Sequence, residues 1–259
     1  MFLVEPPRSQ WDLQFELAGI PVRIHPLFWL VALLLGSNLV INAGDRAGVI
    51  LLIWVAVVLV SILVHEFGHA LVMRYFRESP RVVLYMMGGL AIADSSPYAV
   101  NYGNRGRGPR EQIIISAAGP MAGFLFAALS VAAVYAFGGA VVFHSPIAWS
   151  VSIENLNLAI LVHLLLFVNI FWGLINLLPV YPLDGGQIAR ELFVHQDPWN
   201  GLTRSLWVSV IAGGAAAVAG LLFMQSILMA ILFGSMAFSS YTTLQQMQGG
   251  GGFGGGRPW

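Results

Sequence analysis

The sequence predicts an all-α polytopic membrane protein with about six transmembrane helices and a small membrane-associated β-hairpin or sheet. Apolar residues make up 58% of the chain and charged residues only 9%, whereas a soluble domain carries roughly a quarter charged residues. Several uncharged stretches approach the length of about 20 residues that a membrane span needs. A further apolar segment, residues 80–93, favours strands and is too short to span.

The N-terminal part, residues 1–26, is expected to be a cytoplasmic or interfacial segment. Its first ten residues include Glu5, Pro6 and Pro7 and have no apolar core, so we expect no cleavable signal peptide. Residues 11–24 partly alternate between apolar and polar side chains, which is typical of a short strand or an interfacial segment.

Residues 27–245 are expected to form one membrane domain. The apolar stretch at 205–243 is too long for a single span, so we divide it near Gln225. The expected spans are residues 27–41, 49–75, 113–137, 156–178, 205–224 and 226–243. The remaining residues, 246–259, are rich in glycine and are expected to be a flexible tail.

Residues 80–93 are expected to form a hairpin with a turn at 87–90. Such a hairpin can enter the membrane only where its backbone pairs with protein or lines a wet cavity. The polar residues 97–110 that follow read as a loop.

Arginine predicts the orientation of the spans. All 12 basic residues are arginine, and a cytoplasmic N-terminus places every one except Arg46 on the cytoplasmic side. Residues 138–155 contain no basic residue, as expected of a loop on the outer side. Both termini are therefore expected in the cytoplasm.

A His-Glu-x-x-His motif ends the second expected span, at residues 65–69. On a helix, His65 and His69 fall on one face, one turn apart, where two imidazoles can hold a metal ion. Glu66 lies between them and can act on a water molecule at that metal. Ionisable residues within a membrane helix are costly and usually functional, which favours a metal site over two structural histidines.

A second cluster of polar and helix-breaking residues closes the fourth expected span. Pro179 and Pro182 interrupt the helix, and Asp184 then follows on irregular backbone at the cytoplasmic side. A catalytic zinc ion typically has three protein ligands, so Asp184 is a candidate third ligand. The alternative, equally open from spacing alone, is that Asp184 caps a helix beginning at Gln187.

Together the two motifs resemble the site-2 protease family of zinc intramembrane proteases. Over residues 20–190 the resemblance includes the order of the His-Glu-x-x-His helix and the later Asn-x-x-Pro and Leu-Asp-Gly segments. Residues 20–25, the Gly88-Gly89 pair and residues 118–120 are also similar to family members. Many relatives carry an inserted PDZ domain or a CBS pair, and this chain resembles a minimal form without either.

The resemblance implies a single zinc ion per chain, held by His65, His69 and Asp184, with Glu66 as the catalytic residue. It also implies that Asn176, Gly88 and Gly89 contact substrate. The implied activity is hydrolysis of peptide bonds within or near transmembrane segments of single-span, membrane-tethered regulators, possible examples being anti-sigma factors. The implied location is the plasma (inner) membrane of a bacterium or archaeon.

Two other functions are compatible with the motif. A membrane metalloprotease with a glutamate as third ligand is disfavoured, because no expected span after Glu66 contains a glutamate. A non-proteolytic membrane protein that binds or transports metal remains as the alternative. The absence of cysteine excludes thiolate ligands, and a net charge of +0 gives no case for nucleic acid.

Two polar residues and a pair of glycines in the expected spans are interpreted as structural. His163 and Asn169 are expected to hydrogen-bond across the helix bundle, and neither is expected to bind metal. Gly119 and Gly123 form a Gly-x-x-x-Gly pattern that favours close helix packing. Many relatives have an asparagine where Gly123 stands, so we assign no catalytic role to that helix.

Overall fold

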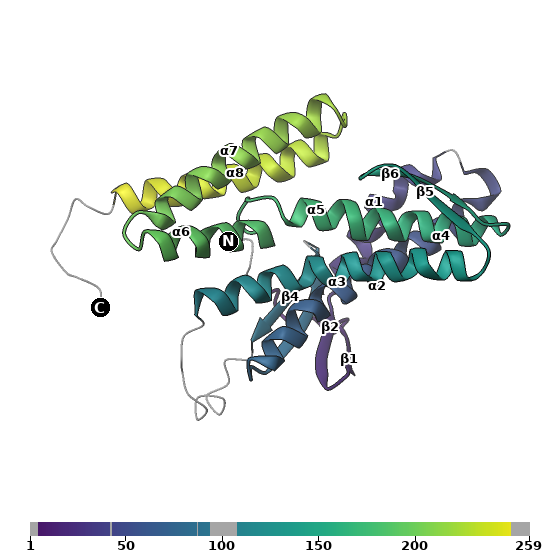
Figure 1. The fold of residues 1–259 in the computed structure, drawn as a ribbon, viewed down its shortest axis with the longest axis horizontal. Coiled ribbons are helices and arrows are strands. Elements are labelled where there is room, and N and C mark those ends of the chain that lie inside the picture. Colours follow the sequence, from purple (N-terminus) through teal and green to yellow (C-terminus); the bar gives the residue numbers. More distant parts are fainter. Residues whose placement is uncertain (1–4, 42, 87, 94–107, 250–259) are drawn as a thin grey trace. The chain divides into compact units, whose positions relative to one another are not determined.

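The structure is a computed structural model that describes residues 5–41, 43–86, 88–93 and 108–249. The chain separates into two compact units, residues 2–176 and residues 177–259. Figure 1 labels most of their helices and strands. The expected loop at 97–110 and the expected glycine-rich tail lie mostly outside the described residues.

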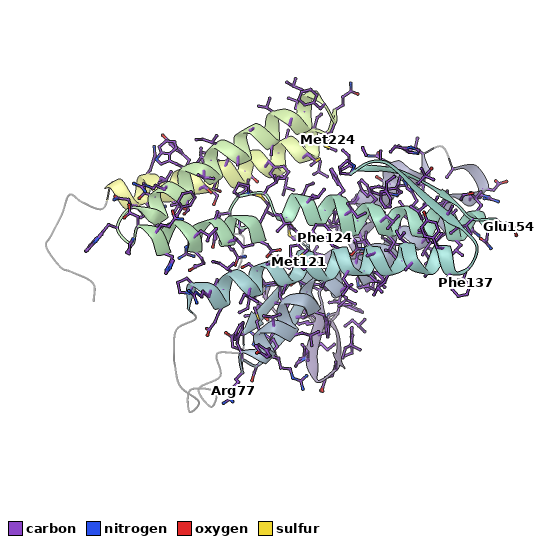
Figure 2. All side chains as sticks on the ribbon, in the orientation of Figure 1. Arg77, Met121, Phe124, Phe137, Glu154 and Met224 are labelled. Atoms are coloured by element: carbon purple, nitrogen blue, oxygen red, sulfur yellow. The ribbon has the colours of Figure 1, made fainter. Side chains whose placement is uncertain are left out.

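Long helices dominate the N-terminal unit. They are α1 (Pro26–Val40), the short 3-10 helix η1 (Gly44–Arg46), α2 (Ala47–Tyr75), α3 (Pro109–Ala136), and a last helix whose consecutive parts are α4 (Leu156–Leu166), the π-helical stretch η3 (Phe167–Trp172) and α5 (Gly173–Asn176). Figure 2 shows Arg77 at one end of this unit and Phe137 and Glu154 at the opposite end.

Five helices in the described residues are long and apolar enough to cross a membrane. They cover residues 44–75, 109–136, 156–176, 201–222 and 227–247. α1 is apolar too, but its 15 residues fall short of the usual span length. The predicted polytopic helical fold is therefore confirmed, with α1 as a short sixth candidate.

A four-stranded sheet lies against the helices of this unit. Its strands β1 (Leu13–Leu17), β2 (Ile20–Ile24), β3 (Pro80–Tyr85) and β4 (Gly88–Ala93) pair in that order. β2 and β3 are parallel, with Val22 opposite Val82, and the other pairs are antiparallel. The predicted hairpin is thus part of a larger sheet, and β4 has already begun at Gly88, inside the turn predicted at 87–90.

The core of the N-terminal unit lies between one face of the sheet and α1, α2 and α4. The sheet contributes Ile20, Val22, Ile24, Val82 and Leu84, all of which are buried. These β-branched and leucine side chains suit a pleated surface covered by helices. This packing brings β3 and β4 beside the C-terminal half of α2, which carries the His-Glu-x-x-His motif.

Residues 138–155 contain a second hairpin that the sequence did not reveal. Its strands are β5 (Ala140–Ser145) and β6 (Ala148–Ser152). Val141 and Trp149 are buried against α3 and α4, and the Tyr135 hydroxyl donates to the Val141 carbonyl over 2.6 Å. The expected loop is therefore ordered by pairing and by contact with helix ends.

The C-terminal unit contains α6 (Asp184–Gln196), α7 (Gly201–Leu222) and α8 (Ile227–Gly249). α7 and α8 are separated by a short turn at the position where the sequence divides the last apolar stretch. The hydroxyls of Ser209 and Ser240 are 2.9 Å apart, which links the two helices by a buried hydrogen bond. α8 continues to Gly249 and so extends into the segment that was expected to be tail.

Candidate metal centre

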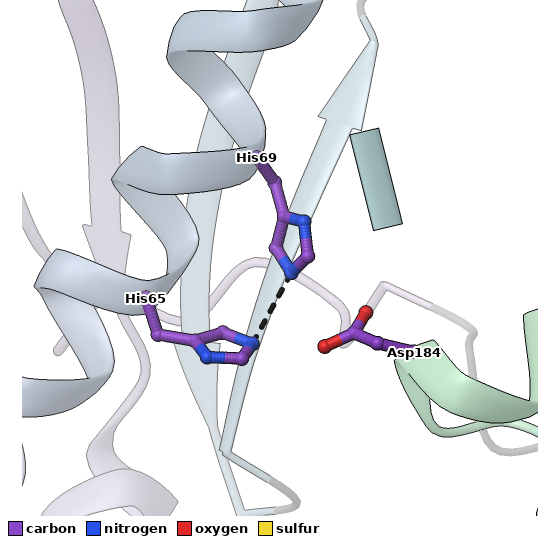
Figure 3. A group of neighbouring side chains, drawn as sticks. All are labelled: His65, His69 and Asp184. Atoms are coloured by element: carbon purple, nitrogen blue, oxygen red, sulfur yellow. Dashed lines mark hydrogen bonds between the residues drawn. The ribbon is translucent and has the colours of Figure 1, made fainter. Parts of the chain in front are cut away.

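Two imidazoles on α2 converge on one point. His65 and His69 are one helical turn apart, and their Nε2 atoms are 3.1 Å apart (Figure 3). Two nitrogens bound to one tetrahedral zinc lie about 3.3 Å apart, because each Zn–N bond is about 2.0–2.1 Å. The spacing of the imidazoles therefore fits two ligands of a single ion.

The second nitrogen of His69 is fixed by the backbone of α3. Its Nδ1 lies 2.6 Å from the Ile115 carbonyl oxygen, and this contact is buried. A carbonyl can only accept a hydrogen bond, so Nδ1 carries a proton, and in the neutral ring Nε2 then presents its lone pair. Metal-binding histidines commonly have such a partner, which sets the tautomer and the ring orientation.

Three glycines provide the space around the motif. A Cβ at Gly119 of α3 would overlap the His69 ring and lie 2.8 Å from Nε2 of His65. A Cβ at Gly68 would overlap the backbone of α3 at Ala118, and one at Gly89 of β4 would overlap the Glu66 carboxylate. Any side chain at these positions would displace α3, the imidazoles or Glu66.

Glu66 is buried beside the histidines, with 5% of its surface exposed. It follows His65 directly on α2, and β4 approaches it at Gly89. A carboxylate held in such a site can take up a proton and return it.

A polar contact one turn before His65 connects α2 to the last helix of the unit. The amide of Asn169, in η3, donates to the Ser61 hydroxyl over 2.8 Å and to the Leu165 carbonyl over 2.9 Å. Asn169 therefore hydrogen-bonds across the bundle, as expected. His163 instead packs its ring against Trp149, with ring centroids 5.8 Å apart.

Asp184 is the first residue of α6 in the C-terminal unit, with Leu183 at the N-cap. Two expectations about the local structure are therefore corrected. Asp184 does not lie on irregular backbone, and the helix does not start at Gln187. Cβ atoms at Gly185 and Gly186 would overlap the backbone at Leu177 and Val180, so the preceding turn packs directly on the helix start.

Asn176, Gly88 and Gly89 were predicted from the family resemblance to contact substrate. Asn176 is the last residue of α5, where the π-containing helix ends. Gly88 begins β4 with a φ of 113°, a conformation that other residues rarely adopt. The sequence did not predict the contact with the Ile115 carbonyl or the steric role of Gly119. The Gly-x-x-x-Gly pattern was the available signal for the role of Gly119.

The family model "Peptidase family M50" matches residues 53–216, a region that includes both motifs. A zinc metalloprotease from Methanocaldococcus jannaschii is 26% identical over 211 residues, covering 81% of this chain and 52% of that protein. Stage IV sporulation protein FB of Bacillus subtilis is 25% identical over 189 residues, covering 70% of this chain and 50% of that protein. The chain thus spans about half the length of the curated relatives it matches.

Among solved structures, a site-2 protease from Methanocaldococcus jannaschii shares the fold. The TM-score is 0.51 at 23% identity, with 91% of this chain and 94% of that chain covered. The family match covers more than half of the residues and includes the membrane helix with the paired histidines. This match confirms the resemblance to site-2 proteases that was predicted from the motifs. The chain is an integral membrane protein that belongs to peptidase family M50.

Proposed function

We propose that the chain is an intramembrane zinc metalloendopeptidase. Its reaction is hydrolysis of peptide bonds within or near the transmembrane segments of membrane-tethered regulatory proteins. The observation that carries this proposal is the pair of imidazoles on a membrane-length helix, aimed at one point with the buried Glu66 beside them. Membership in peptidase family M50 supports the same reaction class.

The proposed ligands of a single zinc ion are His65, His69 and Asp184, the side chains drawn in Figure 3. Two neutral imidazoles and one carboxylate form a typical catalytic zinc set, which leaves a fourth position open. The hydrogen bond from His69 to Ile115 supports this role, because it places the proton of the neutral ring on Nδ1 and leaves Nε2 for the metal. When bound, zinc would supply Lewis acidity and favour ionisation of water at neutral pH.

Glu66 is the proposed general base and acid. Its carboxylate accepts a proton from the attacking water and returns it to the amine that leaves when the peptide bond breaks. Burial beside β4 keeps the carboxylate at the site and away from bulk water. Asn176 is proposed to donate a hydrogen bond to the substrate carbonyl as negative charge develops there.

Substrate is proposed to bind as an added strand on β4. A transmembrane helix hides its peptide bonds, so the substrate must unwind and remain extended during cleavage. β4 pairs with β3 alone among the described strands, so it is the edge of the sheet nearest Glu66. Pairing through the backbone at Gly88 and Gly89 would tolerate many side chains.

The proposed substrates are single-span proteins, for example of the anti-sigma factor type. The arginine distribution supports an orientation with both termini in the cytoplasm and the β5–β6 hairpin outside. Substrates would then be cut near the cytoplasmic end of their spans, at the level of the α2 residues that carry the motif.

The test is the Glu66→Gln variant, a nearly isosteric change that removes the base and no proposed ligand. We expect cleavage of a panel of single-span proteins to fall by about 10²–10⁴-fold while zinc content stays at the wild-type level. Cleavage at the wild-type rate would contradict the base role. If the wild type and the Glu66→Gln variant bind zinc equally and neither cleaves any protein of the panel, the metal-transport alternative would be favoured.

A further inference from the structure

The four-stranded sheet has one face that is only partly covered by helices. On β2, the residues Ile20, Val22 and Ile24 are 1–2% exposed, because they lie under the helices of the N-terminal unit. The residues directly opposite on β1 are Leu17, Phe15 and Leu13, which therefore point to the same face. They are 49%, 38% and 51% exposed.

The other face of the sheet is charged. Arg23 is held between Glu5 and Asp12 with both N–O distances at 2.9 Å, and Arg81 pairs with Glu5 over 2.6 Å. Burial alone would raise the pKa of Asp12, but the Ser9 amide and the Arg23 guanidinium lower this pKa overall. On β1 and β2 the sheet is thus amphipathic, with ion pairs on one face and apolar side chains on the other, while Val83 of β3 is a buried apolar residue on the charged face.

The exposed part of the apolar face lies where α1 begins and α2 ends, and α2 is long enough to span a membrane. β2 leads into α1 at Pro26, and α2 returns to the sheet through β3. The Arg74 guanidinium, in the last turn of α2, donates to the Ala18 carbonyl over 2.6 Å and so holds the β1–β2 turn there. The sheet surface that contacts α1 and α2 therefore continues without a break onto β1.

We propose that Leu13, Phe15 and Leu17 of β1, together with Trp11 in the turn before the strand, insert into the interfacial layer of the leaflet where α1 begins and α2 ends. These four residues are here called the β1 strip. Lipid is the expected occupant because the β1 strip extends the one sheet face that already packs on membrane helices. Trp11 is 76% exposed, and tryptophan prefers the boundary between headgroups and acyl chains. The charged face, turned away, would remain in water.

Insertion of this edge would set the depth of the whole sheet. β1 and β4 are its two edges, and β4 approaches Glu66. A lipid anchor at β1 would therefore hold β4 at a fixed level in the membrane, independently of whether the chain cleaves peptides.

The test is a nitroxide scan along β1 in reconstituted bilayers, which is convenient because the chain has no cysteine. Single variants Leu13→Cys, Gln14→Cys, Phe15→Cys, Glu16→Cys and Leu17→Cys are spin-labelled. Accessibility to oxygen, which concentrates in lipid, is compared with accessibility to a water-soluble nickel chelate. Leu52→Cys serves as the lipid-facing control, because Leu52 is 72% exposed within α2.

We expect the ratio of oxygen to nickel accessibility to alternate with a period of two residues, high at positions 13, 15 and 17 and low at 14 and 16. High nickel accessibility at all five positions would overturn the proposal in favour of a solvated hairpin. Low accessibility to both reagents at 13, 15 and 17 would overturn it in favour of a protein partner, such as a second copy. Reaction rates of the same cysteines with a water-soluble thiol reagent give an independent reading, slow at 13, 15 and 17 if lipid covers them.

Discussion

The histidine pair and Asp184 are positioned by different means. His65 and His69 depend on a neighbouring helix, because Gly119 leaves the space for both rings and the Ile115 carbonyl orients one of them. Asp184 depends on its own surroundings in the sequence, because Gly185 and Gly186 allow the turn before α6 to pack on the helix start. The positions of the histidine rings thus depend on tertiary packing, whereas the position of Asp184 depends on the local backbone.

This difference predicts where mutations act from a distance. At the histidines, a change on α3 should disturb proposed ligands that belong to α2. At Asp184, the sensitive positions should lie within a few residues of the proposed ligand itself. The first two predictions below test these regions and the third tests the sheet edge beside Glu66, in order of decreasing effect.

The largest effect is expected from Gly119→Ala. Its Cβ would overlap the His69 ring, so we expect zinc to bind about 10–100-fold more weakly, as when a metal-supporting contact is lost. Zinc titration of the purified protein measures this. Gly48→Ala, on α2 with no atom within 4 Å of the added Cβ, is the matched control and should bind zinc normally. Equal affinity in both variants would refute the steric role of Gly119.

A smaller loss, about tenfold in zinc affinity, is expected from Gly186→Ala. The added Cβ would overlap the backbone at Val180 and shift the turn that precedes Asp184. Gly214→Ala, in the same unit but with open space around the new Cβ, controls for the general effect of the substitution. If zinc affinity is unchanged while the helices remain folded, Asp184 is either not a ligand or not held by this turn.

The smallest effect is expected at the sheet edge. Neighbouring residues of a strand direct their N–H groups to opposite sides, so only one of Leu90 and Ala91 can donate to an added strand. Proline at that position should lower cleavage about fivefold, for the loss of one backbone hydrogen bond, with zinc content unchanged. Proline at the other position should instead destabilise the β3–β4 pair. Normal cleavage by two folded, zinc-loaded variants would rule out strand capture.

The strand order of the sheet decides where a proline can test substrate binding. The sequence could not tell which strand of the 80–93 hairpin has the free edge. β3 is paired on both sides, with β2 and β4, so a proline at Val83 would test the stability of the sheet and not substrate binding.

Local patterns in the sequence were sufficient for the fold class and for the motif helix. The uncharged apolar stretches predicted the membrane helices, and the i, i+4 spacing of His65 and His69 predicted one shared face. The parallel pairing of β2 with β3 joins residues about sixty positions apart, and no local periodicity encodes it. β5 and β6 are short and irregular in register at Phe143 and Ser145, which left too little alternation to recognise.

The site was predictable only in part for the same reason. Residue type and spacing identified the histidines and Glu66 as candidates. The clearance at Gly119 and the carbonyl of Ile115 come from α3, roughly fifty residues farther along the chain. The role of Asp184 as a third ligand stays a prediction, since it rests on the family resemblance and on zinc chemistry.

The central claim is that His69 and Asp184 bind the same zinc ion. A double-mutant cycle tests it directly, using zinc dissociation constants of the wild type, His69→Ala, Asp184→Ala and the double variant, each measured by competition with a chelator. We predict that each single variant binds zinc much more weakly and that the double variant loses clearly less than the sum of the two losses, as for residues that act as a unit. Wild-type affinity in Asp184→Ala, or losses that add within about 0.5 kcal/mol, would contradict a shared ion.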